Sequence, residues 1–216
     1  TAQTNVQYAK LNTDGSVGTW ASTTPLATAE FSHTSVATNG YVYAIGGNSS
    51  GNAVVQYAKA NANGALSAWR TTTSLSTGQR LHSSVVANGY VYVIGGINDQ
   101  TLVQYAKLNA DGSIGAWQSS SNTLPTLGAY NHASVVANGY VYVLGGYDGN
   151  VATTTVAYAK VNADGSVNAW QTTTALPSAT QLHTAAVANG YVYVLGGSSN
   201  QTSVRYARLN NDGTLG

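Results

Sequence analysis

Apolar residues along the chain fall into short runs separated by turn-forming residues, and the pattern returns about every fifty residues. In the second copy, the runs 81–86 and 90–94 stand on either side of Ala87 and the dipeptide Asn88-Gly89. Asn-Gly favours a two-residue hairpin, because both turn positions need a positive φ that these residues tolerate. The dipeptide recurs at 39–40, 138–139 and 189–190, so each copy is predicted to begin with a β-hairpin.

The second strand of each predicted hairpin is apolar on both faces. In Tyr90-Val91-Tyr92-Val93 the rings point to one side and the valines to the other, so the strand must be covered on both sides. Gly95-Gly96 ends this strand, and a third strand is predicted at 101–108. A tight turn at 111–113 precedes a fourth strand at 114–118, which carries the tryptophan of the copy. Each copy is therefore predicted to be a four-stranded antiparallel meander.

Four such copies, in register, fill the chain. Three sets of residues mark them: Trp20, Trp69, Trp117 and Trp170; His33, His82, His132 and His183; and the glycine pairs 46–47, 95–96, 145–146 and 196–197. A period of this size indicates stacked units that cannot bury their apolar faces alone. Because sheets with two apolar faces can stack radially around an axis, we predict an all-β fold, a β-propeller of four-stranded antiparallel blades. Residues 1–216 are expected to form a single domain.

The order of these residues resembles the kelch repeat. His is followed by a hairpin, by Tyr-Val-Tyr-Val-Leu-Gly-Gly, by a Tyr and by a Trp, as in bacterial-type kelch-like repeats, four times over the whole chain. The resemblance implies a propeller whose ligands often sit on one rim. The Arg that the family places just ahead of the His survives only as Arg80, with Phe31, Tyr130 and Gln181 in the other copies. The acidic residue that often follows the third-strand Tyr is replaced by Ala9, Ala58, Ala106, Ala159 and Ala207.

The ends of the chain are out of phase with the blades. The blade units are predicted at about 22–69, 70–117, 118–170 and 171–216, and residues 6–20 supply a third and a fourth strand without the first two. We expect residues 6–20 to lie beside the last blade and close the ring. Three arrangements stay open: a closed four-bladed monomer, half of an eight-bladed homodimer, or a fragment of a longer array.

Composition narrows the functional classes. Only 7% of the residues are charged and the formal net charge is +1, so the clustered Lys and Arg that nucleic-acid binding needs are missing. No apolar run approaches the roughly 20 residues that span a bilayer, so membrane insertion is not expected. The absence of Cys excludes disulfides, thiolate nucleophiles and the Cys-crosslinked copper centre of galactose-oxidase-type propellers. A chain rich in Thr, Asn, Gly and Tyr but poor in charge suits an extracellular or cell-surface protein of a prokaryote.

One predicted rim varies between copies while the other keeps its Asn-Gly and Asp-Gly turns. The variable loops follow the glycine pairs and precede the histidines, where rigid scaffolds often display binding residues. Aromatic faces beside amides and carboxylates suit sugars and also peptides. The candidate ligand-binding residues are Glu30, Phe31, Arg80, Asn98, Asp99, Tyr130, Tyr147 and Asp148. Relaxed constraint on surface loops is the competing interpretation.

Other chemistry has weaker support in the sequence. We interpret the four repeated histidines as structural, each bonded to the backbone of a neighbouring blade, and expect no metal or cofactor. A paired-carboxylate glycosidase site would need Glu30, the only Glu, with Asp99 or Asp148. The preferred hypothesis is a non-catalytic binding propeller that recognises carbohydrate or protein. A structural or self-assembling repeat module is the alternative, and an enzyme is the third hypothesis.

Overall fold

The structure is a computed structural model that describes residues 1–48, 50–98, 101–125, 130–198 and 201–216. Within these ranges the regular secondary structure is entirely β, with no helix. The strands are β1 (Gln7–Tyr8), β2 (Ala21–Ser22), β3 (Thr34–Thr38), β4 (Tyr41–Ile45), β5 (Val55–Lys59), β6 (Arg70–Thr71), β7 (Ser83–Ala87), β8 (Tyr90–Ile94), β9 (Val103–Lys107), β10 (Gln118–Ser119), β11 (Ala133–Ala137), β12 (Tyr140–Leu144), β13 (Val156–Lys160), β14 (Gln171–Thr172), β15 (Thr184–Ala188), β16 (Tyr191–Leu195) and β17 (Val204–Arg208).

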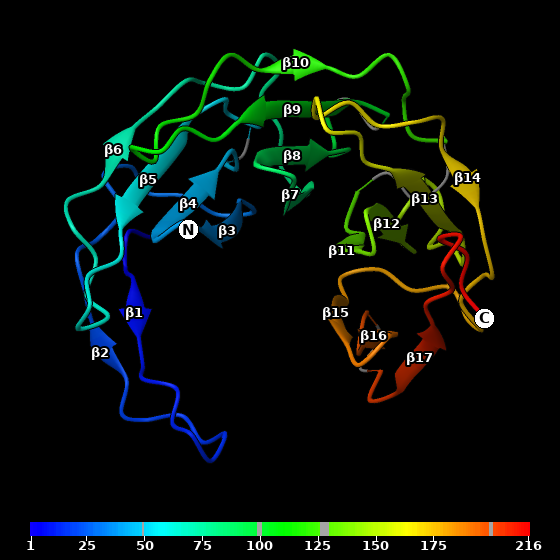
Figure 1. The fold of residues 1–216 in the computed structure, drawn as a ribbon. Coiled ribbons are helices and arrows are strands. Elements are labelled where there is room, and N and C mark those ends of the chain that lie inside the picture. The colour runs from blue at the N-terminus through cyan, green and yellow to red at the C-terminus, as the bar shows by residue number, and fades with distance from the viewer. Residues whose placement is uncertain (49, 99–100, 126–129, 199–200) are drawn as a thin grey trace.

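The strands form antiparallel blades around a common centre (Figure 1). We call β3–β6 the first blade, β7–β10 the second, β11–β14 the third, β15–β17 the fourth, and β1–β2 the N-terminal hairpin. In the described part of the chain the first three blades have four strands and the fourth has three. The innermost strands β3, β7, β11 and β15 are neighbours in that order. The all-β propeller expected from the repeat is confirmed.

The first hairpin of each blade has the predicted turn. Its asparagine adopts φ between 49° and 51° and its glycine φ between 77° and 79° in all four copies. In the second blade these residues are Asn88 and Gly89, and the ladder pairs Ala87 directly with Tyr90. The left-handed φ at both turn positions matches the right-handed twist of the flanking strands.

The fourth strand differs from the prediction. Residues 114–118 do not form one continuous strand: Ile114 makes an isolated bridge to Leu108, and the regular ladder pairs Gln118 with Tyr105. Between these contacts the pairing shifts by one residue, as in a β-bulge. The bulge allows Ile114 and Trp117, three residues apart, to pack into the same apolar cluster.

Each interior blade is buried on both faces, as the alternation in its second strand predicts. Tyr92 packs toward the third blade against Val141 and Val143, whereas Val91 and Val93 pack toward the first blade. The same arrangement recurs at the next interfaces, where tyrosine rings stack on the third strand of their own blade. The apolar core is therefore a series of layers between blades.

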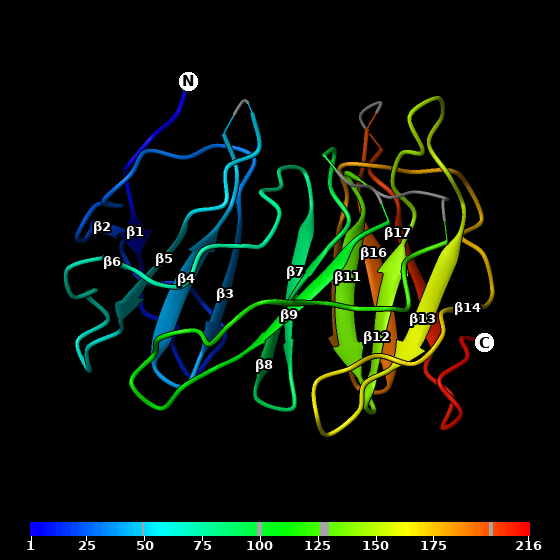
Figure 2. The same ribbon diagram turned by 90° about the horizontal axis from the view of Figure 1, so that it is seen from above.

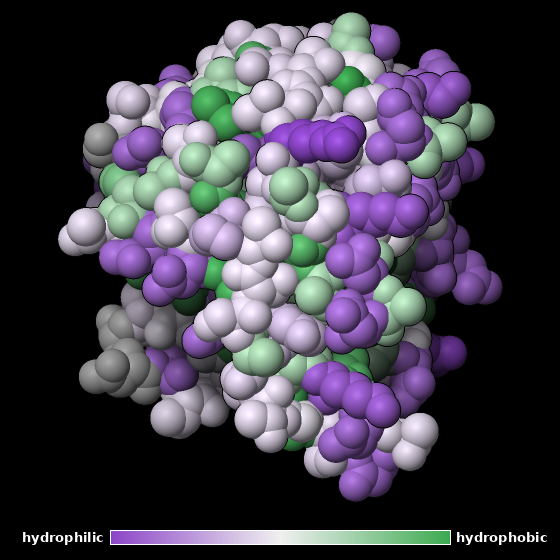
Figure 3. Space-filling model, turned by 90° about the vertical axis from the view of Figure 1, so that its left-hand side faces the viewer, coloured by the Kyte–Doolittle hydropathy of each residue, from purple (hydrophilic) through white to green (hydrophobic). Residues whose placement is uncertain are grey.

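The expected closure of the ring is wrong for this structure. β2 pairs with β1, and in the described residues no strand pairs with the free edge of β17. The N-terminal hairpin packs on the first blade through Val6 and Leu26, and it lies across an opening from the fourth blade (Figure 1). The side of the molecule that carries this hairpin exposes apolar groups among polar ones (Figure 3). β1 is close in sequence to β2 and resembles β17, so it can occupy the position that closure would give to β17.

One pair of substitutions tests the register between blades. The Tyr92 hydroxyl donates a 2.8 Å hydrogen bond to the Gly165 carbonyl of the next blade, whereas the equivalent buried Tyr142 hydroxyl has no partner among the described residues. Tyr92→Phe should lower the free energy of unfolding by about 1–2 kcal/mol, because a buried carbonyl loses its donor. Tyr142→Phe should be neutral or stabilising. Urea denaturation of both variants measures the difference, and equal losses would contradict this register.

Candidate functional site

The predicted variable loops lie along one edge of the propeller, the upper edge in Figure 2. In every blade, the residue after the glycine pair donates a backbone hydrogen bond to the residue two before the histidine. These bonds are Asn48 to Phe31 at 2.7 Å, Ile97 to Arg80 at 3.1 Å, Tyr147 to Tyr130 at 2.8 Å and Ser198 to Gln181 at 2.8 Å. We call the surface formed by these eight residues the variable rim. The loop after the glycine pair and the loop before the histidine, which the sequence analysis placed on one rim, are thus joined within each blade.

An aromatic pair dominates the third-blade part of the variable rim. The Tyr130 and Tyr147 rings have centroids 5.4 Å apart and planes inclined by 59°, and both side chains are half-buried. The Tyr147 hydroxyl donates to the Asn150 carbonyl at 2.8 Å, which fixes its ring. Burial, followed by the nearby Tyr147 and Asp148, raises the pKa of Tyr130, so this phenol stays protonated and neutral at pH 7. The pair offers a fixed aromatic surface.

Two of the polar residues that were predicted to bind a ligand form hydrogen bonds with the backbone instead. Asn98 donates from Nδ2 to the carbonyls of Ser50 at 3.0 Å and Gly78 at 2.9 Å, so it holds loops of adjacent blades together. The Asp148 carboxylate accepts the backbone N–H groups of Asn150 and Val151, both at 2.8 Å, and these bonds lower its pKa. Both residues shape the rim. The predicted Asp99 lies outside the described residues.

The remaining candidates come from the first and second blades. Glu30 is only 3% exposed, and its two carboxylate oxygens accept from Asn52 Nδ2 at 3.0 and 3.1 Å. Burial raises the pKa of Glu30, and the bond from Asn52 partly opposes that effect. Phe31 and Arg80 are half-buried, and Arg80 Nε has no hydrogen-bond partner among the described residues. Arg80 is the one cation among the eight residues of the variable rim.

A feature that the sequence analysis missed lies at the centre of this rim. Ser32, Leu81, Asn131 and Leu182 have φ between 54° and 58°, although none is glycine. Leu81, Asn131 and Leu182 each donate the backbone N–H to the carbonyl of the preceding member of the series, at 3.1, 3.0 and 2.9 Å. Positive φ is uncommon for Leu and has an energetic cost that the surrounding structure must offset. Only Asn131 carried a sequence signal for this conformation.

The four histidines line the centre with these residues, around a hollow of about 280 Å³. Two of them bond hydroxyls of the preceding blade: His82 Nε2 bonds the Thr34 hydroxyl at 2.8 Å, and His132 Nε2 bonds the Ser83 hydroxyl at 2.7 Å. The backbone of Ile45 also acts on His82, and the backbone of Ile94 acts on His132. The hydroxyl in each bond belongs to the residue after the histidine of the preceding blade. At the third position that residue is Ala133, and neither His183 ring nitrogen has a partner among the described residues.

Burial keeps these imidazoles neutral. It lowers the pKa of His82 to about 3, with smaller contributions from the charges of His132 and His33. It also lowers the pKa of His132 to about 4, with a smaller contribution from His183. No group of three or more His, Asp or Glu in the described ranges is arranged to hold a metal ion. Likewise, no helix there is long and apolar enough to cross a membrane.

Comparisons with known proteins agree with this architecture. No curated protein matches the chain. Residues 128–156 match the family model described as "Kelch motif". The solved structure described as "Structure of YjhT" superimposes with a TM-score of 0.70 over 98% of this chain and 77% of that chain, at 16% sequence identity. At that identity the similarity shows the fold alone.

The fold and the matched motif place the chain among the β-propellers, in which each blade is formed by one sequence repeat. This chain is a β-propeller that carries a kelch motif at residues 128–156, and the order of its repeated residues predicts both. Kelch propellers are mostly non-catalytic binding or structural modules.

Proposed function

We propose that the chain is a non-catalytic binding propeller that recognises carbohydrate or a protein segment through the variable rim. The observation that carries the proposal is the fixed pair formed by Tyr130 and Tyr147 on the variable rim. Aromatic faces present apolar area at little conformational cost, and their faces suit sugar C–H groups or peptide side chains. Arg80 and Phe31 add a cation and another ring on neighbouring blades. In this proposal, Asn98 and Asp148 act by shaping the loops.

The positions of the carboxylates favour binding over catalysis. Glu30 precedes β3 of the first blade, whereas Asp148 follows β12 of the third, and the second blade stands between them. Glu30 is bonded to Asn52, and Asp148 is bonded to its own loop. A paired-carboxylate mechanism needs two carboxyl groups flanking one bond, about 5–10 Å apart.

The scarcity of charge also leads us to propose an extracellular or cell-surface location.

A glycan array tests the carbohydrate form of this function. The wild type should bind at least one glycan class, and Tyr130→Ala, Tyr147→Ala should weaken that binding at least about 30-fold, because aromatic anchors dominate such sites. The control, Tyr130→Phe, Tyr147→Phe, keeps both rings and should retain most of the affinity. Unchanged binding by the alanine variant would contradict the assignment of the rim. Absence of any glycan binding would favour a protein ligand, to be sought with a peptide array and the same variants.

A structural or self-assembling role is the second candidate, and exposed apolar side chains at the two ends of the array favour it. Trp20 in the N-terminal hairpin is 63% exposed and Tyr206 in the fourth blade is 71% exposed. Their equivalents at interior positions, Trp117 and Tyr158, are buried. A repeat module whose blades continue between molecules would cover both ends.

A further inference from the structure

We propose that the fourth blade is completed by β2 of a second copy of this chain, with Trp20 of that copy filling a pocket between the third and fourth blades. The inference is independent of any ligand on the variable rim. Four features of the fold carry it: an empty strand position, an empty tryptophan position, an exposed blade face and the distance between the two ends of one chain.

The empty strand position lies at the free edge of β17. In the first blade the third and fourth strands pair Gln56 with Thr71, and in the third blade they pair Ala157 with Thr172. β1 and β2 form the same short ladder, pairing Gln7 with Ser22. Arg205 occupies the position of Gln56 and Gln7 in the repeat, so the repeat predicts Ser22 as its partner. β17 and β1 are therefore equivalent partners for β2.

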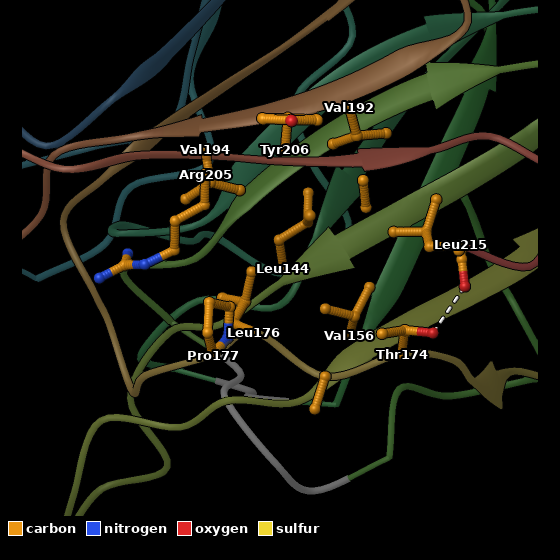
Figure 4. A pocket seen from close by; sticks show the side chains of 13 residues that line it. Leu144, Val156, Thr174, Leu176, Pro177, Val192, Val194, Arg205, Tyr206 and Leu215 are labelled. Carbon is orange, nitrogen blue, oxygen red and sulfur yellow. Dashed lines mark hydrogen bonds between the residues drawn. The ribbon is translucent and has the colours of Figure 1, made fainter.

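The empty tryptophan position is the apolar pocket in Figure 4, with a volume of about 250 Å³. Leu144, Val156 and Leu176 of the third blade line it on one side, and Val192, Val194 and Leu215 of the fourth on the other. Thr174 at its edge donates its hydroxyl to the Leu215 carbonyl at 2.6 Å.

The other interfaces show what this pocket accepts. Thr73 donates its hydroxyl to the Ile114 carbonyl at 2.7 Å, as Thr174 does to Leu215. The Thr73 carbonyl in turn accepts from the indole of Trp117 at 2.9 Å. The first blade repeats both bonds, with the indole of Trp69 donating to Thr24 at 3.0 Å. The Thr174 carbonyl is thus the acceptor position for an indole that the described part of the fourth blade does not supply. Trp20, largely exposed beside β2, is such an indole.

The outer face of the fourth blade is also uncovered. Val204 is 58% exposed, whereas its equivalents Val103 and Val156 are at most 1% exposed. Tyr206 has the same contrast with Tyr158. When β2 of a second copy joins β17, the first blade of that copy follows it in the array and covers this face. Thr184 of the fourth blade then meets His33 of the second copy, which repeats the contact between Thr34 and His82.

A second copy suits this position better than the same chain. Within one chain the N-terminal hairpin and the fourth blade lie on opposite sides of the opening, and β15 is not a neighbour of β3 (Figure 1). The exchange replaces one short ladder with an equivalent one: β2 leaves two residue pairs, continued by backbone bonds from Thr23 to Val6 and from Leu26 to Thr4, and takes the corresponding edge of β17. The gain is the burial of Trp20, Val204 and Tyr206. Two copies can satisfy both ends by reciprocal exchange, which closes a ring of eight blades.

Sedimentation velocity of the 216-residue chain gives the first test. We expect twice the 22.2 kDa of one chain at micromolar concentration. Trp20→Ala should raise the dissociation constant at least about 30-fold, the size of effect expected for a buried aromatic anchor. Val17→Ala is the matched control: Val17 belongs to the same hairpin and is 53% exposed, but the exchange leaves it outside the pocket. A monomer at all concentrations, or a dimer that Trp20→Ala leaves unchanged, would overturn the proposal.

Cross-linking separates exchange from closure within one chain. The sequence has no cysteine, so Ser22→Cys, Arg205→Cys introduces the only two thiols. Directly paired residues on antiparallel strands have Cα atoms about 4.5–5.5 Å apart, within the range that a disulfide spans. Oxidation should give a covalent dimer on a non-reducing gel. A disulfide that forms within one chain, or no disulfide in the oxidised protein, would rule out the exchange. Circular dichroism of each variant checks that the fold is retained.

Discussion

Trp117→Ala is expected to lower the free energy of unfolding by about 4 kcal/mol, since deletion of a buried tryptophan removes apolar contacts and leaves a cavity. Trp117 is 8% exposed, packs in the layer between the first and second blades, and donates its indole N–H to the Thr73 carbonyl. The substitution should also leave that carbonyl without a donor. Urea denaturation followed by far-ultraviolet circular dichroism measures the loss.

Leu11→Ala is the control for this substitution. Leu11 occupies a repeated core position, yet it is 77% exposed because no blade covers that face of the N-terminal hairpin. Its removal should change the free energy of unfolding by less than about 0.5 kcal/mol, as is usual for surface positions. A loss at Trp117 as small as the loss at Leu11 would show that the layers between blades do not hold the fold together.

Acidification from pH 7 to pH 5 is expected to destabilise the protein by about 4 kcal/mol, about 2 kcal/mol for each of His82 and His132. Burial lowers the pKa of these histidines to about 3 and about 4, below the value of about 6.5 in the unfolded chain. A lowered pKa means that the folded state binds fewer protons. The stabilisation is therefore complete above pH 6.5 and is lost as the pH falls toward the folded values.

The acid effect can be assigned to its source. Glu30, whose pKa is raised by burial, acts in the opposite direction near pH 5, and the exposed turn aspartates titrate at lower pH. His132→Gln should remove about half of the difference between the urea midpoints at pH 7 and pH 5. Equal midpoints at both values in the wild type would contradict the buried, neutral state of these rings.

The strands and their radial stacking could be predicted because each signal was local and repeated four times. Asn88-Gly89 specifies its own turn, and the alternation in Tyr90-Val91-Tyr92-Val93 already requires cover on both faces. The bulge before Trp117 could not be predicted in this way. It depends on the advantage of placing Ile114 and Trp117 in one layer, which is a property of the neighbouring blade.

The terminal strands and the variable rim contain features that local sequence patterns could not predict. β1 and β17 resemble each other, so the sequence alone does not decide which of them pairs with β2. Strand order predicts that Tyr130 and Tyr147 lie on the rim, whereas only the structure shows that their rings are close together. The left-handed Leu81 had no local signal, because a chain of hydrogen bonds between blades holds its conformation. Asn98 was predicted to contact a ligand because local sequence does not show that its side chain bonds Ser50 of the adjacent blade.

A crystal structure of the 216-residue chain tests most directly whether these sheets stack radially around a shared centre. The account predicts that β3, β7, β11 and β15 surround that centre in order and that the Tyr92 hydroxyl meets the Gly165 carbonyl of the next blade. A flat two-layer sandwich, or appreciable helix in place of the blades, would contradict it.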